Sequence, residues 1–180
     1  MSNSDPTSLA ARREYKELLA GTDIFEGERI KPLLKSFLDR YPDYPPALRL
    51  QGLLIEHEVS EDIANGIDVP SYDSRMTQMC ESFEAAMQSD PCYVLALIDL
   101  GDYWKDYGGD CEQAVQRYDR AIQLLKDGHS SENGSEEMRD AYAGKISALI
   151  EMGKIGEASN CRSSAMVDCN GDEYFENLQI

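Results

Sequence analysis

Three aspartates follow one another at helical spacing in the middle of the chain. Asp99, Asp102 and Asp106 are three and four residues apart, so a helix through them would carry all three carboxylates on one face. Like charges at this spacing repel one another by about 0.2–0.5 kcal/mol per pair. A cationic ligand would relieve that repulsion. A solvated face with Lys105 as the local counter-charge is the other interpretation, and the sequence leaves both open.

Motifs for metal binding or catalysis are weak throughout the chain. The stretch from Asp168 to Glu173 has oxygen-bearing side chains at alternate positions, as at the start of a calcium loop. It lacks the central glycine, and Gln179 stands where a bidentate acid is needed. His57 and His129 are far apart, and the cysteines form no CxxC pair, so we expect no zinc site. Without a nucleophile elbow, phosphate loop or dinucleotide motif, the sequence predicts a non-catalytic protein with no cofactor.

The net charge of −17 is distributed unevenly along the 180 residues. Residues 1–42 hold seven basic and seven acidic side chains, whereas residues 43–180 hold ten basic and twenty-seven acidic ones. Such a surface repels phosphate groups, so we expect neither a nucleic acid nor an anionic membrane as a partner. A solvated surface kept soluble by repulsion and an acidic groove for a basic segment would both explain this distribution.

The cysteines and the first residues of the chain predict a cytoplasmic protein. Five cysteines without a paired motif are expected to be reduced thiols. The first residues have neither the basic start nor the apolar stretch of a secretory signal. The longest apolar runs are too short to cross a bilayer.

Almost every stretch has a helical period, and none alternates like a strand. We predict one domain over 1–180, made of helical hairpins at about 7–42, 45–91, 92–127 and 135–169 and an acidic tail over 170–180. The apolar stripes predicted for the first hairpin are Leu9, Tyr15, Leu18 and Leu19, followed by Ile30, Leu33, Leu34, Phe37 and Leu38. Residues 58–72 exceed the length of a hairpin turn and are predicted to be an insertion in the second hairpin.

Small and large apolar residues recur in a regular order between residues 83 and 121. They are Phe83, Ala86, Asp90-Pro91, Ala96-Leu97, Leu100-Gly101, Trp104, Ala114, Tyr118 and Ala121. This pattern resembles the tetratricopeptide repeat (TPR) family, most specifically around Gly101 and more loosely over most of the chain. The interrupted second hairpin, an unusual turn at residues 108–110 and Lys145-Ile146 in place of Leu-Gly depart from the family pattern. The resemblance implies an all-α solenoid of about four antiparallel helical hairpins, with irregular repeats stacked in a superhelix.

The small and the aromatic residues of this pattern have different expected roles. Gly101 and Ala114 are expected to let paired helices approach closely, while Trp104 and Tyr118 fill the space between one hairpin and the next. A leucine in place of Gly101 should therefore disrupt the packing.

The resemblance also implies a ligand face, because ligands of this family usually lie along the first helices of the hairpins. On this chain that face comprises Arg49, Leu53, Leu95, Ile98, Asp99, Asp102, Lys105, Asp106, Ser147 and Ile150. The implied function is a protein–protein interaction module that binds a peptide or protein segment, which we expect to be basic, in an acidic and aliphatic concave groove. A secretion or assembly chaperone of the TPR type and a self-associating structural scaffold are the alternatives.

Overall fold

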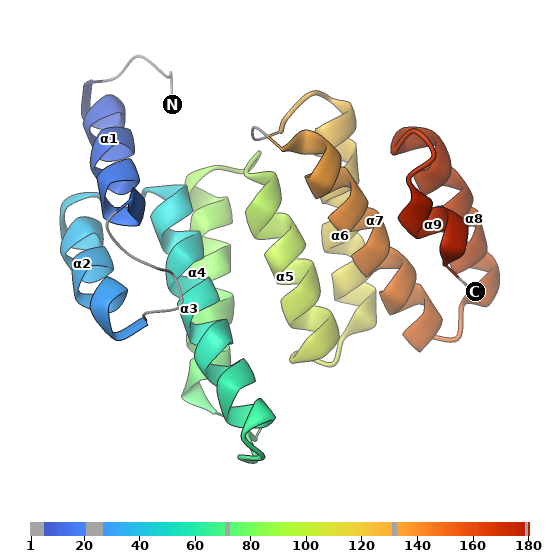
Figure 1. Ribbon diagram of the computed structural model, residues 1–180, viewed down its shortest axis with the longest axis horizontal. Helices are drawn as coiled ribbons and strands as arrows, with labels where there is room; N and C mark the ends of the chain where they lie inside the picture. The colour runs from blue at the N-terminus through green and yellow to red at the C-terminus, as the bar shows by residue number, and fades with distance from the viewer. Residues whose placement is uncertain (1–5, 21–26, 71–72, 131–132, 179) are drawn as a thin grey trace. The chain divides into compact units, whose positions relative to one another are not determined.

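The computed structural model describes residues 6–20, 27–70, 73–130, 133–178 and 180. These residues form nine α-helices and no strand, which confirms the predicted all-α class (Figure 1). The helices are α1 (Pro6–Ala20), α2 (Gly27–Arg40), α3 (Pro45–Ala64), α4 (Ser74–Ser89), α5 (Val94–Asp106), α6 (Cys111–Lys126), α7 (Gly134–Glu151), α8 (Ile155–Asp168) and α9 (Glu173–Asn177). The chain divides into two compact units, Met1–Pro91 and Cys92–Ile180. The prediction of a single domain stays a prediction.

Local sequence signals explain several helix boundaries. Two prolines begin α3, where the first backbone amides have no helical partner in any case. The side chains of Asp73 and Asp110 cap α4 and α6 by accepting hydrogen bonds from the backbone N–H groups of Arg75 (2.9 Å) and Gln113 (3.0 Å). Between α5 and α6, Gly109 has a φ of +65°, a left-handed conformation that glycine adopts without strain.

In the first unit, α2 packs against α1 and α3, and α4 packs along α3 (Figure 1). The buried core of the first three helices comprises Ala11, Ile30, Leu34, Phe37, Ala47, Leu50 and Leu54. The hydroxyl of Tyr15 donates a hydrogen bond of 2.9 Å to the carbonyl of Pro46, which ties α1 to the start of α3. Gly52 lets the ring of Phe83 lie against α3, since a Cβ at residue 52 would stand 2.4 Å from that ring.

Two leucines of the predicted apolar stripes are exposed. Leu9 keeps 55 % and Leu33 keeps 49 % of its surface accessible, while Ala11 and Leu34 are buried. A helical stripe has edges, and a residue at an edge is buried only if a neighbouring element covers it.

The predicted insertion at 58–72 is helical over its first half. Helix α3 continues through this segment as far as Ala64, and Val59 is fully buried. The extra length therefore adds nearly two turns to α3, and the chain leaves the helix through Gly66, whose φ is +76°. Residues 71–72 lie outside the described residues.

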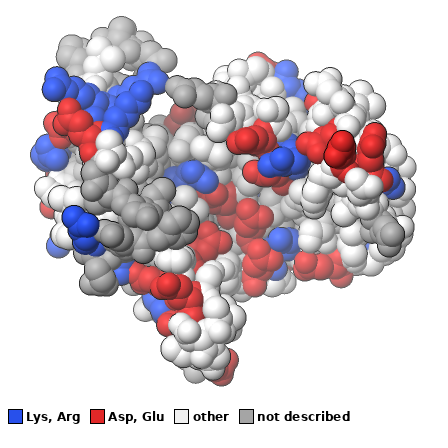
Figure 2. All heavy atoms as spheres, viewed as in Figure 1, with Lys and Arg blue, Asp and Glu red and all other residues white. Residues whose placement is uncertain are grey.

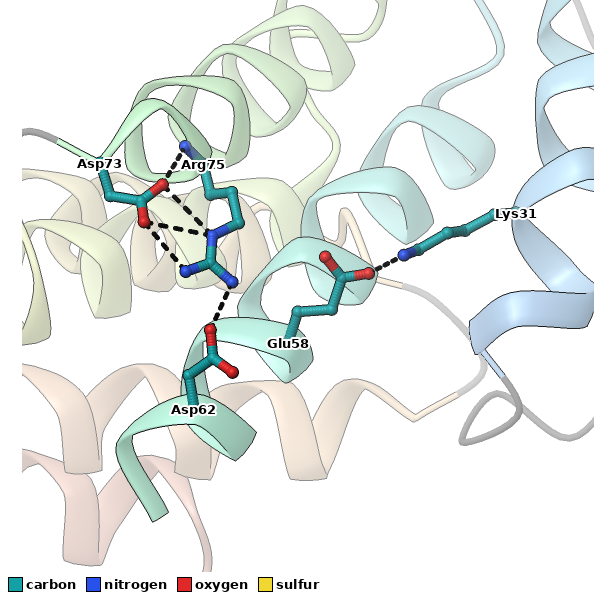
Figure 3. A network of polar contacts seen from close by, with 5 residues as sticks. All are labelled: Lys31, Glu58, Asp62, Asp73 and Arg75. Atoms are coloured by element: carbon teal, nitrogen blue, oxygen red, sulfur yellow. Dashed lines mark hydrogen bonds and ion pairs between the residues drawn. The ribbon is translucent and has the colours of Figure 1, made fainter. Parts of the chain in front are cut away.

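An ion-pair network fastens this extension to its neighbours (Figure 3). The guanidinium of Arg75, at the start of α4, lies 2.7 Å from a carboxylate oxygen of Asp62 and 2.9 Å from one of Asp73. The hydrogen bonds that the guanidinium donates to both carboxylates hold the pKa of Arg75 above its usual range. On the other side of α3, Lys31 of α2 pairs with Glu58. The network thus connects α2, the end of α3 and the start of α4.

In the second unit, α5 and α6 form a hairpin, α7 packs against both, and α8 packs against α7 (Figure 1). Short α9 packs on α8, with Phe175 fully buried. Arg162 of α8 donates hydrogen bonds to the backbone carbonyls of Phe175 (2.6 Å) and Glu176 (2.9 Å). The first part of the acidic tail is therefore a packed element of this unit.

Candidate peptide-binding face on α5 and α7

The predicted ligand face rests on a closely packed contact between three helices. Tyr118 of α6 is fully buried and lies between Gly101 of α5 and Gly144 of α7. A Cβ at residue 101 would stand 2.5 Å from the tyrosine ring, and one at residue 144 would stand 2.4 Å from it. Both glycines are needed because the ring cannot move away from one helix without meeting the other.

The hydroxyl of Tyr118 gives Asp102 a structural partner. It donates a hydrogen bond of 2.6 Å to Oδ1 of Asp102. Burial raises the pKa of Asp102 to about 6, and the nearby charges of Asp99 and Asp106 add to the rise, while the Tyr118 hydrogen bond and Lys105 oppose it. Burial and the same carboxylate hold the pKa of Tyr118 above its usual range, so the phenol stays protonated. Asp102 is thus a half-buried carboxylate held by the core, not a free surface acid.

Negative charge surrounds the ammonium group of Lys105. Its Nζ lies 3.1 Å from a carboxylate oxygen of Asp106. Burial lowers the pKa of Lys105, but the carboxylates of Asp106, Asp102 and Glu151 raise it above its ordinary value overall. Figure 2 shows acidic atoms gathered over α5. Three carboxylates around one ammonium leave an excess of negative charge on this face.

Helix α7 contributes to the same face. Ser147 is half-buried and Ile150 is 37 % exposed. Glu151, which is exposed, lies within 3.5 Å of the Ser147 hydroxyl and of the thiol of Cys111. Sequence reasoning missed Glu151, although its position four residues after Ser147 places the two on one helical face.

Other predicted ligand residues lie deeper or in the other unit. Ile98 and Asp99 are buried, with 6 % and 8 % of their surfaces accessible, and Leu95 is half-buried. Ile98 and Asp99 therefore cannot form an open wall of a groove. Arg49 and Leu53 are half-buried on α3 and belong to the first unit, whereas the α5–α7 face belongs to the second.

The surroundings of the cysteines and of the calcium-like stretch can be described from the structure. Burial raises the pKa of Cys111, Cys161 and Cys169, which keeps these thiols protonated and poorly nucleophilic. The parts of the chain that the structure describes contain no group of three or more His, Cys, Asp or Glu residues able to hold a metal ion. Asp168 pairs with Lys126 (2.7 Å) and accepts a hydrogen bond from Tyr142, which accounts for the first residue of the calcium-like stretch.

A hollow lies elsewhere, between α1 and α2 of the first unit. Apolar side chains and the paired charges of both helices surround it: Leu9, Ala10, Arg13, Glu14, Glu17, Leu18, Leu33, Ser36, Phe37 and Arg40. A second depression on the outer side of α1 is lined by Leu9, Arg12, Arg13, Lys16, Glu17 and Ala20. Neither surface was predicted, because the sequence only groups Leu9 and Leu33 with the apolar stripes of their helices.

The chain matches no protein-family model and no curated protein. None of the described helices has both the length and the apolar content needed to cross a membrane.

Proposed function

We propose that the chain is a non-catalytic protein-interaction module that binds a basic peptide segment on α5 and α7. The observation that carries this proposal is the placement of Asp102, Asp106 and Glu151 around Lys105. A second cation from a ligand would balance the excess carboxylates. Electrostatic selection of this kind raises the rate of association and the discrimination between ligands more than it raises affinity.

The hairpin packing of the second unit supports the same function. Helices α5 and α7 are the first helices of two successive hairpins and pack against one another. In the proposed solenoid, their outer faces would form one side of a concave groove, in which Ile150 supplies an apolar contact beside Glu151. Tyr118 and its two glycines would keep the two helices at a fixed spacing, so the face would be formed before the ligand arrives.

Fluorescence anisotropy with labelled peptides tests this proposal. The probes are two short random peptide pools of equal length, one rich in Lys and Arg and the other rich in Asp and Glu. We expect binding of the basic pool only, with the affinity weakening as the salt concentration rises. The variant Asp106→Asn/Glu151→Gln should bind about fivefold more weakly, since each exposed charge pair is worth about 0.5 kcal/mol.

A matched control distinguishes the effect of the α5–α7 face on peptide binding from the effect of the overall negative charge. Glu81→Gln/Glu157→Gln removes the same number of charges from exposed positions on α4 and α8. This control should bind the basic pool as the wild type does. Equal loss of affinity in both variants would show that general acidity, and not the α5–α7 face, attracts the peptide.

A further inference from the structure

One end of the first unit is both apolar and basic. Leu9 and Leu33, which are about half exposed, stand beside the exposed side chains of Arg12, Arg13 and Lys16. We call these five residues the basic end. Figure 2 shows Lys and Arg atoms gathered over α1.

The charges around the two α1 hollows do not cancel. Their linings include four cations, Arg12, Arg13, Lys16 and Arg40, and two anions, Glu14 and Glu17. Both anions are already paired within the unit, Glu17 with Arg13 (3.0 Å) and Glu14 with Arg40. The basic end is thus locally positive on a chain whose net charge is −17.

One end of the second unit has the opposite character. Val167 is 76 % exposed at the end of α8, and Tyr174 is 48 % exposed on α9. Glu173 and Glu176 are exposed on the same short helix. We call these four residues the acidic end. Residues 163–180 hold four acidic side chains and no basic one. The guanidinium of Arg162 lies next to α9, but the hydrogen bonds it donates there go to the backbone carbonyls of Phe175 and Glu176.

We propose that the basic end of one copy of this chain docks on the acidic end of a second copy. Each end combines exposed large apolar side chains with an excess of charge of one sign, as expected for a protein-interaction surface. The two ends are complementary in charge and are carried by the same chain, so a second copy supplies the matching surface. Because the two surfaces differ, the contact is heterologous and leaves one end of each chain available for a further copy.

The overall negative charge does not prevent this contact. At about 0.1 M salt, charges separated by more than about 10 Å are largely screened, whereas charges in contact at an interface are screened much less. The repulsion between whole chains therefore weakens faster with salt than the local attraction between the two ends.

Sedimentation velocity at about 0.1 M salt tests the proposal. The wild type is expected to show a mass that increases with concentration above the 20.2 kDa of one chain. Arg12→Glu/Lys16→Glu, which reverses the basic end, should stay monomeric. Glu173→Lys/Glu176→Lys, which reverses the acidic end, should also stay monomeric. Circular dichroism spectra and melting curves check that both variants are folded.

Mixing the two variants gives the decisive measurement. The first variant keeps its acidic end and the second keeps its basic end, so the mixture should form a one-to-one dimer. A mixture that stays monomeric would overturn the proposal, as would a wild type that is monomeric at every concentration. Self-association of either variant alone to the extent of the wild type would overturn it too, because another surface would then be responsible.

Two further variants test separately whether apolar contacts and the overall charge contribute to the association. Leu9→Ser with Val167→Ser changes two exposed side chains, so the fold should be retained while the association weakens by several-fold. Arg120→Glu/Lys154→Glu carries the same change in charge as the basic-end variant but alters exposed positions on α6 and in the α7–α8 turn. This control should associate as the wild type does, and its failure to associate would overturn the assignment of the contact to α1.

Discussion

At the scale of single residues, Tyr118 is fully buried and closely enclosed by two helices of the second unit. Its ring is held between Gly101 and Gly144, so an added methyl group at either glycine must push the ring toward the other helix. We expect Gly144→Ala to lower the free energy of unfolding by about 1–3 kcal/mol. Gly156→Ala is the control, because a Cβ there meets no atom within 4 Å and costs nothing sterically. Urea denaturation measures the free energy of unfolding of both variants. Equal values for Gly144→Ala and Gly156→Ala would contradict the proposed role of Gly144.

Asp102 adds a pH dependence at the same scale. Its pKa is about 6 in the folded protein and has the ordinary value of 3.8 in the unfolded chain. Between these two values the folded protein binds a proton that the unfolded chain has lost, so this residue lowers the free energy of unfolding as the pH rises from about 4 to about 6. Asp102→Asn cannot ionise and keeps an oxygen to accept the hydrogen bond from Tyr118.

The measurement is urea denaturation of the wild type and of Asp102→Asn at several pH values in this range. The fluorescence of the single tryptophan, Trp104, reports unfolding. Relative to the wild type, the variant should gain up to about 3 kcal/mol of stability as the pH rises. Stability curves that remain parallel from acid to neutral pH would show that Asp102 titrates alike in the folded and unfolded chains.

At the scale of secondary-structure elements, the extension of α3 depends on Arg75. The guanidinium is the contact between α4 and Asp62 on the last turns of α3. In Arg75→Gln, we expect faster amide hydrogen exchange in residues 58–67 and little change in the exchange of the rest of the unit. Arg139→Gln is the control. The guanidinium of Arg139 lies 3.5 Å from the carboxylate of Asp140, its neighbour in the sequence, so this ion pair does not connect two helices. Unchanged exchange in Arg75→Gln would mean that packing alone, through Val59, holds the extension.

At the scale of the whole molecule, the net charge of −17 sets the response to salt. Like charges repel in the compact state, and raising the salt from about 0.01 M to about 0.15 M shortens the screening length from about 30 Å to about 8 Å. The ion pairs seen among the described residues, such as Arg13–Glu17, Lys31–Glu58 and Lys145–Asp119, are mostly partly exposed, so each contributes less than about 1 kcal/mol. We therefore expect the melting temperature to rise by a few degrees over this range, measured by circular dichroism. A fall would show that the ion pairs outweigh the repulsion.

The sequence by itself predicted most of the helical segments, where several of them begin and end, and that small residues would bring α5 close to its partner. It did not predict the helical end of α3 or the short helix α9. These properties depend on periodicity, proline, glycine and capping residues, all of which act over a few neighbours in the chain. The tertiary structure alone decided which side of each helix is covered. It exposed Leu9 and Leu33, buried Ile98 and Asp99, and extended α3 through about the first half of a predicted insertion.

The same division holds for the candidate site. Spacing placed Asp99, Asp102 and Asp106 on one helical face, but only folding brought the Tyr118 hydroxyl to Asp102 and Glu151 to Lys105. Burial and electrostatic environment depend on groups distant in sequence, and a periodic pattern on one helix carries no information about those groups.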